Sequence, residues 1–458
     1  MDPIQELRQV LGDACTTDPS ELEAVRTDKS GRSSDGAPLA LVNAHTIADV
    51  QNTMVVADKH GIPVVPRGAG TGLAGGANGA IGTIVLSLKS MNRIIEIAQD
   101  DQLAVVEAGV INGDLNAALA EFGLWFAPDP ASRAISSVGG NIATNAGGLL
   151  CSKYGVTREA VLGLTVVLAD GRIVHTGRRT VKGVTGYDLN SLFVGSEGTL
   201  GVIVEATVRV LPIIDGDVVT IGAIFPTVEA AAAASAAITA DRLRPSVMEI
   251  LDAPALAAAE AYVGVEEMTA TIGVTHGGSY LLVQFDGGPE SSVMQRALQC
   301  IEDAGGTANA TSDPAIGDRL IQLRRAMHPA LAASGEVLIE DVAVPRSKLP
   351  EMFRAIADIA RRHDVSIPTL AHAGDGNLHP NFVFTGAEPP ENVWRAADEL
   401  FRAALALGGT LTGEHGVGVL KRRWLRDELG DDSYELQRQI KSVFDPTGIL
   451  NPNVMFSH

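Results

Sequence analysis

Residues 66–76 read Pro-Arg-Gly-Ala-Gly-Thr-Gly-Leu-Ala-Gly-Gly, directly after a short apolar run. The stretch contains a GxGxxG pattern at Gly70, Gly72 and Gly75, which in nicotinamide-binding domains opens a helix. Here more glycines follow, and then the strand-like run of residues 83–88, so that no helix of sufficient length fits. The sequence therefore argues against a nicotinamide domain. Successive glycines still let backbone N–H groups converge on one point, which predicts an anion-binding loop without a helix.

Two further loops share this small-residue composition. Residues 128–148 contain Pro-Asp-Pro-Ala-Ser and Gly-Gly-Asn-Ile-Ala-Thr-Asn-Ala-Gly-Gly, and residues 194–203 read Val-Gly-Ser-Glu-Gly-Thr-Leu-Gly-Val-Ile. Glycines allow the backbone to approach a ligand closely, while serine, threonine and asparagine offer hydrogen bonds to its edge. Each loop alone also fits a structural turn, but three in one half of the chain predict a site for a flat heteroaromatic ligand.

The composition is that of a globular protein, with 46% hydrophobic and 20% charged residues among 458. A net charge of −20 argues against a nucleic-acid partner, because phosphate binding needs a basic surface. Neither a secretory signal nor a transmembrane segment is expected, since no long apolar run occurs. Cys15, Cys151 and Cys300 are far apart, which argues against an iron–sulfur cluster within this chain and favours a reducing, cytoplasmic location. Peripheral association with a membrane is the alternative.

Histidines cluster in the last third of the chain. Residues 370–382 read Leu-Ala-His-Ala-Gly-Asp-Gly-Asn-Leu-His-Pro-Asn-Phe, and Glu414 and His415 lie in a second glycine-rich stretch. The Gly-Asp-Gly-Asn turn between two apolar runs predicts a hairpin that brings His372 and His379 together. Two imidazoles and a carboxylate form a common divalent-metal site that leaves positions open for substrate. From spacing alone, a structural histidine pair remains the alternative.

The three loops, in this order and spacing, resemble the FAD-binding domain of the vanillyl-alcohol oxidase and p-cresol methylhydroxylase superfamily. The motifs HxGDGNLH and GEHGxG resemble those of its D-2-hydroxy-acid dehydrogenase branch, which includes D-lactate, glycolate and D-2-hydroxyglutarate dehydrogenases. The resemblance covers essentially the whole chain. It implies an α+β fold, with a two-subdomain FAD-binding domain and an α+β substrate-cap domain built on a ferredoxin-like antiparallel sheet. The expected divisions are an N-terminal helical segment over 1–34, the FAD-binding domain over 35–212, the cap with its metal site over 213–430, and a C-terminal segment over 431–458 that returns to the flavin.

The resemblance also implies which residues hold the cofactor. The pyrophosphate cradle would be Pro66, Arg67, Gly68, Ala69, Gly70, Thr71, Gly72 and Leu73. The flavin and its ribityl chain would lie against Pro128, Asp129, Ser132, Gly140, Asn141, Thr144 and Ala146. The remaining contacts would come from Glu197 and Ile203 beside the adenine half, and from Asn451 at the flavin. Since the loops contain neither histidine nor cysteine, FAD is expected to bind non-covalently.

By the same resemblance, His372, His379 and Glu414 would hold a divalent metal, with zinc favoured over manganese or iron. His415 would act as the base that takes the substrate's hydroxyl proton, because a metal-bound hydroxyl is acidic enough for an imidazole to deprotonate. Arg324 is expected to bind the substrate carboxylate, with a solvated helix charge as the alternative and Arg325 as a competitor. The last expected substrate contact is Asn381.

The expected activity is oxidation of a small 2-hydroxy acid to the 2-oxo acid. The hydroxyglutarate enzymes carry a lysine some fifteen residues after the arginine, whereas this chain has Ile339 and Glu340 there, which favours D-lactate or glycolate. Electrons must leave to an external acceptor, such as a quinone, a cytochrome, an electron-transfer protein or an iron–sulfur partner subunit. The alternatives are an FAD oxidase of another alcohol or sugar that uses dioxygen, the flavin subunit of a multi-protein glycolate oxidase-type complex, and a non-enzymatic FAD sensor.

Overall fold

The structure is a computed structural model that describes residues 2–264, 278–386 and 388–456. The chain divides into two compact units. The first unit consists of Met1–Gly148, Gly155–Ile213 and Glu414–His458, and the second of Leu149–Tyr154 and Ile214–Gly413. Compared with the cap expected over 213–430, the second unit ends earlier and gains a short segment from the middle of the first.

A small sheet in the first unit carries the first glycine loop. The elements here are α1 (Pro3–Leu11), η1 (Gly12–Ala14), β1 (Cys15–Thr16), α2 (Pro19–Ala24), β2 (Ala40–Asn43), α3 (Ile47–His60), β3 (Val64–Arg67) and β4 (Ile84–Ser87). The strand order is β1-β2-β4-β3, and β2 and β3 both run parallel to β4. Helix α3 connects β2 to β3, starting at a capping box of Thr46 and Asp49 and ending at Gly61, whose φ of 63° favours glycine. The glycine loop leads from β3 to the strand β4, as predicted.

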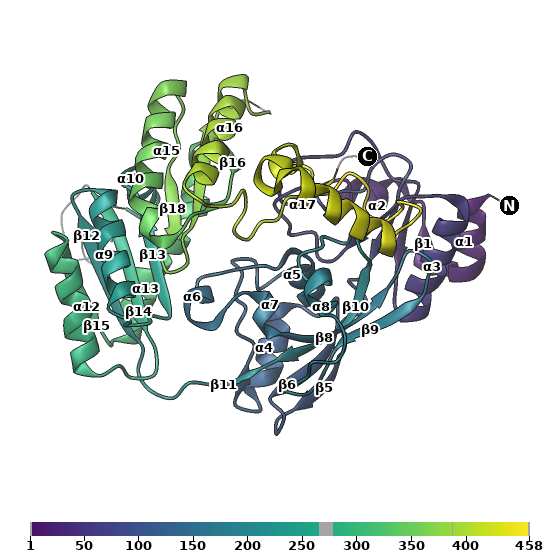
Figure 1. Cartoon of the computed structure of the whole chain (residues 1–458), viewed down its shortest axis with the longest axis horizontal. Helices are drawn as coiled ribbons and strands as arrows, with labels where there is room; N and C mark the ends of the chain where they lie inside the picture. Colours follow the sequence, from purple (N-terminus) through teal and green to yellow (C-terminus); the bar gives the residue numbers. More distant parts are fainter. Residues whose placement is uncertain (1, 265–277, 387, 457–458) are drawn as a thin grey trace. The chain divides into compact units, whose positions relative to one another are not determined.

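A second sheet in the first unit carries the other two small-residue loops. Its elements are β5 (Ile94–Ala98), β6 (Leu103–Glu107), α4 (Asn112–Ala120), β7 (Leu124–Trp125), α5 (Val138–Thr144), α7 (Thr157–Ala160), β8 (Val161–Val167), β9 (Ile173–Gly177), α8 (Asn190–Phe193), β10 (Val202–Arg209), β11 (Leu211–Pro212) and α17 (Arg422–Phe444). The antiparallel order is β5-β6-β10-β8-β9, and β11 pairs with β7. The C-terminal helix α17, yellow in Figure 1, adds Ile440 and Phe444 to the core of this sheet. The phenyl ring of Phe444 meets Phe193 of α8 edge-on, with ring centroids 5.3 Å apart.

The first half of the second unit is ferredoxin-like. Its elements are α6 (Cys151–Tyr154), β12 (Val219–Phe225), α9 (Val228–Ala240), β13 (Val247–Leu251), α10 (Ala253–Val263), β14 (Ser279–Phe285), α12 (Ser291–Asp303) and β15 (Thr307–Thr311). The antiparallel strand order β15-β12-β14-β13 is that of the ferredoxin-like β-α-β-β-α-β motif, with α10 as an additional helix between β13 and β14. This confirms the cap architecture that the resemblance implied.

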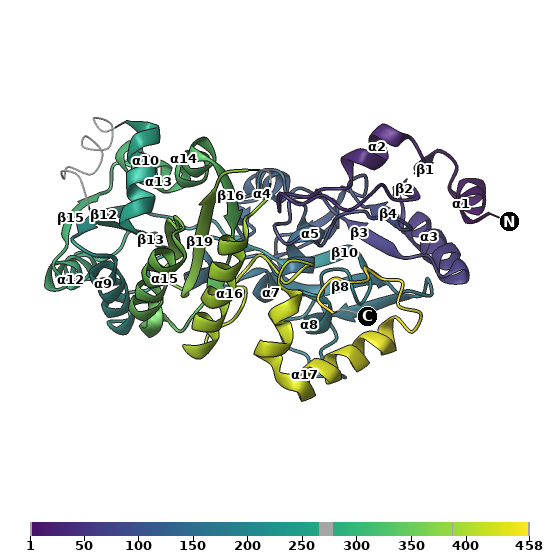
Figure 2. The ribbon, with the colours of Figure 1, turned by 90° about the horizontal axis from the view of Figure 1, so that it is seen from above.

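The second half of the unit extends this sheet to the histidine motif. It contains α13 (Pro314–Arg325), α14 (Met327–Ser334), β16 (Glu336–Ile339), β17 (Val342–Ala343), η2 (Arg346–Lys348), α15 (Leu349–His363), β18 (Thr369–His372), β19 (Asn377–Phe384) and α16 (Glu391–Ala406). Strand β18 pairs with β13, and the sheet continues through β19 to β16, with β17 also on β19. Figure 2 shows α9, α12, α15 and α16 on one face of the sheet and α10, α13 and α14 on the other. The central strands are therefore buried on both faces.

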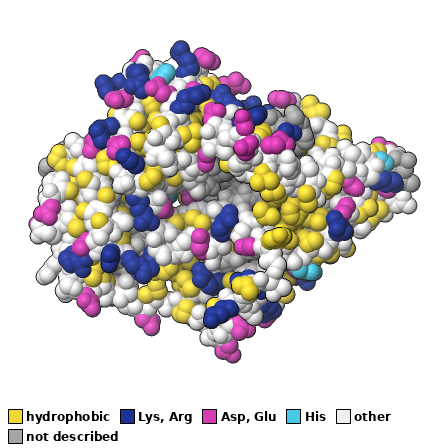
Figure 3. Space-filling model, in the orientation of Figure 1, with side chains coloured by type: hydrophobic (Ala, Val, Ile, Leu, Met, Phe, Trp, Pro, Cys, Tyr) yellow, Lys and Arg dark blue, Asp and Glu magenta, His cyan; other side chains and the backbone are white. Residues whose placement is uncertain are grey.

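The surface shows how the net charge is distributed. On the face drawn in Figure 3, acidic and basic side chains are interspersed rather than gathered by sign. Among the residues that the structure describes, no helix is both long enough and apolar enough to cross a bilayer. The expected cytoplasmic location stays a prediction.

Candidate functional site

The two motif histidines are placed by the β18–β19 hairpin. His372 is the last residue of β18, and its Cα partner on β19 is Asn377, while His379 pairs with Leu370. This diagonal register puts both imidazoles on the same face of the sheet. Both histidines are buried, and their ring centroids lie 5.0 Å apart at an interplanar angle of 85°. The hairpin and the convergence of the histidines agree with the prediction from the turn sequence.

Glu414 joins the histidines because the residues just before it are anchored to the same sheet. The Thr410 N–H donates to the carbonyl of Ala343 at 2.8 Å, and the Thr412 hydroxyl donates to Asp341. Glu414 follows Gly413, the last residue of the second unit. One donor atom from each of His372, His379 and Glu414 lies within 4.8 Å of the other two. This compact set of two imidazoles and a carboxylate fits a divalent ion with open coordination positions.

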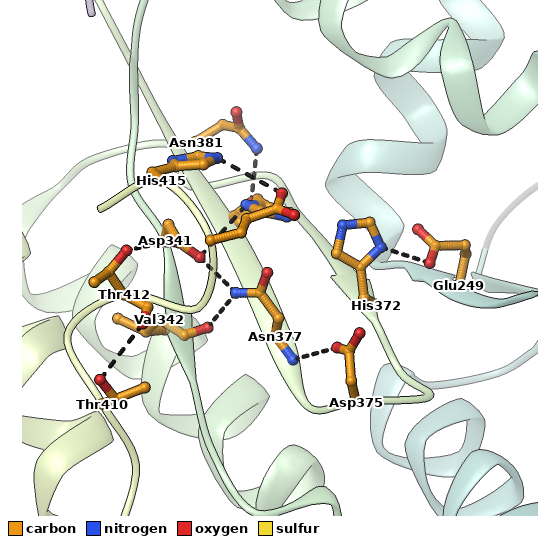
Figure 4. A network of polar contacts seen from close by, with 12 residues as sticks. Glu249, Asp341, Val342, His372, Asp375, Asn377, Asn381, Thr410, Thr412 and His415 are labelled. Carbon is orange, nitrogen blue, oxygen red and sulfur yellow. Dashed lines mark hydrogen bonds and ion pairs between the residues drawn. The ribbon is translucent and has the colours of Figure 1, made fainter. Parts of the chain in front are cut away.

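A buried carboxylate behind His372 orients that histidine. Glu249 on β13 is the Cα partner of His372, and its Oε1 lies 2.6 Å from the His372 Nδ1 (Figure 4). Burial alone would raise the pKa of Glu249, but the neighbouring His372 and Arg324 outweigh it and lower the pKa below its usual value. An ionised carboxylate only accepts hydrogen bonds, so Nδ1 of His372 carries the proton and Nε2 is the nitrogen left for a metal. Glu249 was not among the residues expected from the sequence, although a lone acid inside the apolar run of residues 247–251 was a usable signal.

Arg324 contacts the other oxygen of the same carboxylate. Its Nε donates to Glu249 Oε2 at 2.6 Å, and the arginine side chain is 13% exposed. Arg324 is therefore not a solvated helix charge, which decides against one of the alternatives that the sequence left open. The hydrogen bond to Glu249 uses Nε of Arg324 and not its two terminal nitrogens. That these nitrogens bind the substrate carboxylate stays a prediction.

The second histidine also faces a buried acid. Asp341 Oδ1 lies 3.9 Å from the Nδ1 of His379. The carboxylate of Asp341 also accepts hydrogen bonds from the side chains of Asn377 and Thr412. Figure 4 shows this network between the hairpin and the segment that leads to Glu414. Asp341 thus links strand β19, which carries His379, to the segment that leads to Glu414. Asp341 also was not among the site residues expected from the sequence.

Asn381 and His415 flank the cluster along the chain. The Asn381 amide donates to the His379 carbonyl at 2.7 Å and to the Pro368 carbonyl at 3.2 Å, so its side-chain nitrogen serves the hairpin. The carbonyl oxygen of Asn381 is the atom that remains suited to a substrate contact. The His415 side chain is 9% exposed, and its Nε2 lies 3.9 Å from Glu414 Oε1. The base predicted from the sequence is thus adjacent to a metal-site donor.

The side chain of Arg67 supports the first glycine loop through hydrogen bonds. Its guanidinium donates to the carbonyls of Ala77 at 2.6 Å and Thr27 at 2.8 Å, so it helps to hold the loop in place. A Cβ at Gly68 would lie 2.4 Å from Ser137 Oγ, so a side chain there would force the serine hydroxyl to move. The backbone of the loop therefore passes directly against the start of α5. The whole cradle expected from the sequence stays a prediction: Pro66, Arg67, Gly68, Ala69, Gly70, Thr71, Gly72 and Leu73.

The second loop joins the first around a cavity. Ser137 caps the N-terminus of α5, because its hydroxyl accepts the Gly140 N–H. A cavity of about 280 Å³ is lined by Ala69 of the first loop, by Ser137, and by residues near β5 and α4. The buried amide nitrogen of Asn141 has no hydrogen-bond partner in the described chain, as expected of a donor aimed at a cofactor. Backbone and side-chain hydrogen bonds hold four other predicted flavin-side residues: Pro128, Ser132, Thr144 and Ala146. The predicted Asp129 is buried.

The third loop holds a buried carboxylate, Glu197, that contacts the loop after His415; its expected place beside the adenine stays a prediction. Glu197, which the resemblance placed beside the adenine, accepts the backbone N–H groups of Val417 at 2.7 Å and Gly418 at 2.8 Å. Burial raises the pKa of Glu197 to about 7, although both N–H groups favour the charged form. Its carboxylate is thus engaged by the loop after His415, so we assign it to holding that loop. The neighbouring Ile203 lies in β10, opposite Val166.

Asn451 closes the same region from the C-terminus. Its amide donates to the Gly76 carbonyl at 2.9 Å and to the Glu197 carbonyl at 2.7 Å. This side chain therefore links the first and third loops. Its nitrogen is used within the protein, so a direct flavin contact by Asn451 stays a prediction.

The sequence and the fold of this chain were compared with those of known proteins. Residues 38–177 match the FAD binding domain, and residues 215–455 match the C-terminal domain of FAD linked oxidases. The chain is 38% identical to the glycolate oxidase subunit GlcD of Bacillus subtilis, covering 100% of this chain and 97% of that protein. It is 37% identical to a D-lactate dehydrogenase of Archaeoglobus fulgidus, covering 88% of each. The solved structure of p-cresol methylhydroxylase with bound substrate aligns with a TM-score of 0.76 at 18% identity, covering 98% of this chain and 95% of that one, which supports a shared fold.

Proposed function

We propose, from the premise that this chain belongs to the FAD-linked oxidases, that it oxidises D-lactate or glycolate to the corresponding 2-oxo acid. Membership makes the chain an FAD-dependent hydroxy-acid oxidoreductase, as predicted. His372, His379 and Glu414 bind a divalent ion in this proposal, with zinc favoured over manganese or iron. The proposal also includes non-covalent attachment of FAD, because the cofactor loops lack histidine and cysteine.

One observation carries the proposal: three metal-type donors within 4.8 Å, next to a further histidine. An oxidation of this class must remove a hydroxyl proton and a hydride from the same carbon. When bound, a divalent ion would acidify the substrate hydroxyl, and FAD would accept the hydride. His415 would take the proton on a ring nitrogen. Arg324 would hold the carboxylate with the nitrogens that Glu249 leaves free, while the carbonyl oxygen of Asn381 would orient the substrate.

The preference for a small monocarboxylate rests on residues 326–347. This segment contains no lysine that could meet a second carboxylate. It does contain Glu340, which is 1% exposed, and Asp341, which is fully buried. Buried acids disfavour the approach of another anionic group. We therefore favour D-lactate and glycolate over D-2-hydroxyglutarate.

The electrons must pass to an acceptor outside the chain. The three cysteines, Cys15, Cys151 and Cys300, lie far apart in the sequence and form no CxxC pair. One relative is named a subunit of glycolate oxidase, which supports a role as the flavin subunit of a larger assembly. Co-purification with an iron–sulfur protein would support that version, and full turnover with a soluble quinone or cytochrome as the acceptor would support the independent enzyme.

The decisive experiment is anaerobic flavin bleaching by a panel of D- and L-2-hydroxy acids. We expect D-lactate or glycolate to bleach the flavin, L-lactate and D-2-hydroxyglutarate to do so much more slowly, and a chelator to stop the reaction until Zn²⁺ or Mn²⁺ is returned. Full bleaching after complete removal of metal would refute the metal-assisted version. Flavin that no hydroxy acid bleaches would favour the sensor.

A further inference from the structure

Glu249 stands out because its two carboxylate oxygens serve two different functional residues. Oε1 accepts from Nδ1 of His372 and Oε2 accepts from Nε of Arg324, both at 2.6 Å. His372 is a proposed metal ligand, and Arg324 is the proposed carboxylate-binding residue. One rigid group thus lies between the two contacts that a 2-hydroxy acid would need.

The surroundings hold this carboxylate in place. Glu249 is the third residue of β13, an entirely buried strand that pairs with β14 on one side and β18 on the other. The register sets its Cα opposite that of His372, while Arg324 comes from the last turn of α13. Glu249 is 1% exposed, and burial of a carboxylate destabilises the folded chain unless both oxygens are paired. Both oxygens are paired here. For a purely structural role, an apolar residue would fill this position as well or better.

We propose that Glu249 is a positioning residue that couples the metal site to substrate binding, an inference that rests on the proposed function. Through Oε1 it fixes His372 with Nε2 available to the metal and makes that nitrogen a stronger donor. Through Oε2 it fixes the plane of the Arg324 guanidinium, so that the terminal nitrogens present a fork at a constant distance from the metal ligand. A substrate whose hydroxyl and carboxylate sit on adjacent carbons fits such a fixed spacing.

The substitution Glu249→Gln isolates this role. Glutamine has the same shape but one acceptor oxygen for two donors, so either His372 or Arg324 loses its partner. Glu249→Asp keeps both oxygens but withdraws them by one methylene. Asp252→Asn is the matched control: Asp252 is another buried acid of the same unit, which accepts N–H groups of Ala255 and Thr369.

The test measures Zn²⁺ affinity of the metal-free, full-length protein by competition with a chelator, and separately KM and kcat for D-lactate with the reloaded enzyme. We expect Glu249→Gln to weaken Zn²⁺ binding by about 10–100-fold and to raise KM more than it lowers kcat. Glu249→Asp should give an intermediate affinity, and Asp252→Asn should bind Zn²⁺ like the wild type. The aspartate variant serves the same purpose if the glutamine variant does not fold.

Two outcomes would overturn the proposal and are distinguishable. If the wild type binds Zn²⁺ tightly and the Glu249 variants bind it equally well with unchanged KM, Glu249 does not position the site. If the wild type binds neither Zn²⁺ nor Mn²⁺, the proposed function fails at its metal, and the coupling fails with it.

Discussion

The contact between Glu197 and the loop after His415 can be tested by one substitution, Glu197→Ala. The carboxylate accepts two N–H groups, from Val417 and Gly418, and all three groups are buried. A buried donor left without an acceptor costs about 1–3 kcal/mol. Loss of both hydrogen bonds should therefore destabilise the closed loop by about 2–6 kcal/mol, which raises its open population at least about 30-fold.

Hydrogen–deuterium exchange measured by mass spectrometry on peptides that cover residues 413–420 checks this directly. Exchange in these peptides should accelerate by at least about 30-fold in the variant, because each amide exchanges from the open state. Peptides from β12 and β14 should keep their wild-type rates. Glu205→Ala is the control, because Glu205 lies in β10, directly after the loop that carries Glu197. This variant should leave the exchange rates over residues 413–420 unchanged. Unchanged exchange over residues 413–420 in Glu197→Ala would refute the assignment of Glu197 to holding this loop.

Three further predictions concern the base, the cofactor loops and a buried acid. His415→Asn should retain its flavin and lose about 100-fold or more in kcat as measured with an artificial acceptor, since general bases contribute about that much; a rate within a few-fold of wild type would show that His415 is not the base. Gly148→Ala should purify with less FAD per chain by absorbance, because a Cβ there would lie 2.3 Å from the Asp129 carbonyl oxygen; full flavin content would contradict the close packing of this loop. Burial raises the pKa of Asp252 from 3.8 to about 7, so its stabilising contribution is complete below about pH 4 and is lost as the pH rises through 7, up to about 4 kcal/mol. The thermal midpoint of the wild type should therefore fall more steeply between pH 5 and pH 8 than that of Asp252→Asn, and parallel profiles would argue against this carboxyl.

The fold and the convergence of the two histidines were accessible from the sequence because local signals carry them. The resemblance of the short loop and histidine motifs implied the ferredoxin-like cap, and the turn before Asn377 predicted the hairpin. Glycine-rich loops at strand ends indicated the cofactor domain without any knowledge of tertiary contacts. In each case the decisive residues lie within a few positions of one another.

The supporting residues were not accessible in the same way. Glu249 meets Arg324 across 75 positions of sequence, and Glu197 meets Gly418 across 221. Nothing local to Glu197 indicates that its carboxylate binds a loop more than two hundred residues away, so this contact could not be predicted from the sequence. For Glu249, the charge within an apolar strand signalled importance, but only the strand register identified its partner.

The division of the chain has a consequence for its synthesis. Asp286 of the second unit is bound by Lys153 and Tyr154, which leave the ribosome long before it does. In the first unit, β3 and the first glycine loop bind residues close to the C-terminus. The Val64 N–H donates to the Ile449 carbonyl, and the Asn451 amide donates to the Gly76 carbonyl. A nascent chain can thus complete the histidine-bearing unit while the cofactor loops still lack their last partners. Truncation of the final ten residues should therefore yield a protein that is made and partly folded, yet fails to retain FAD.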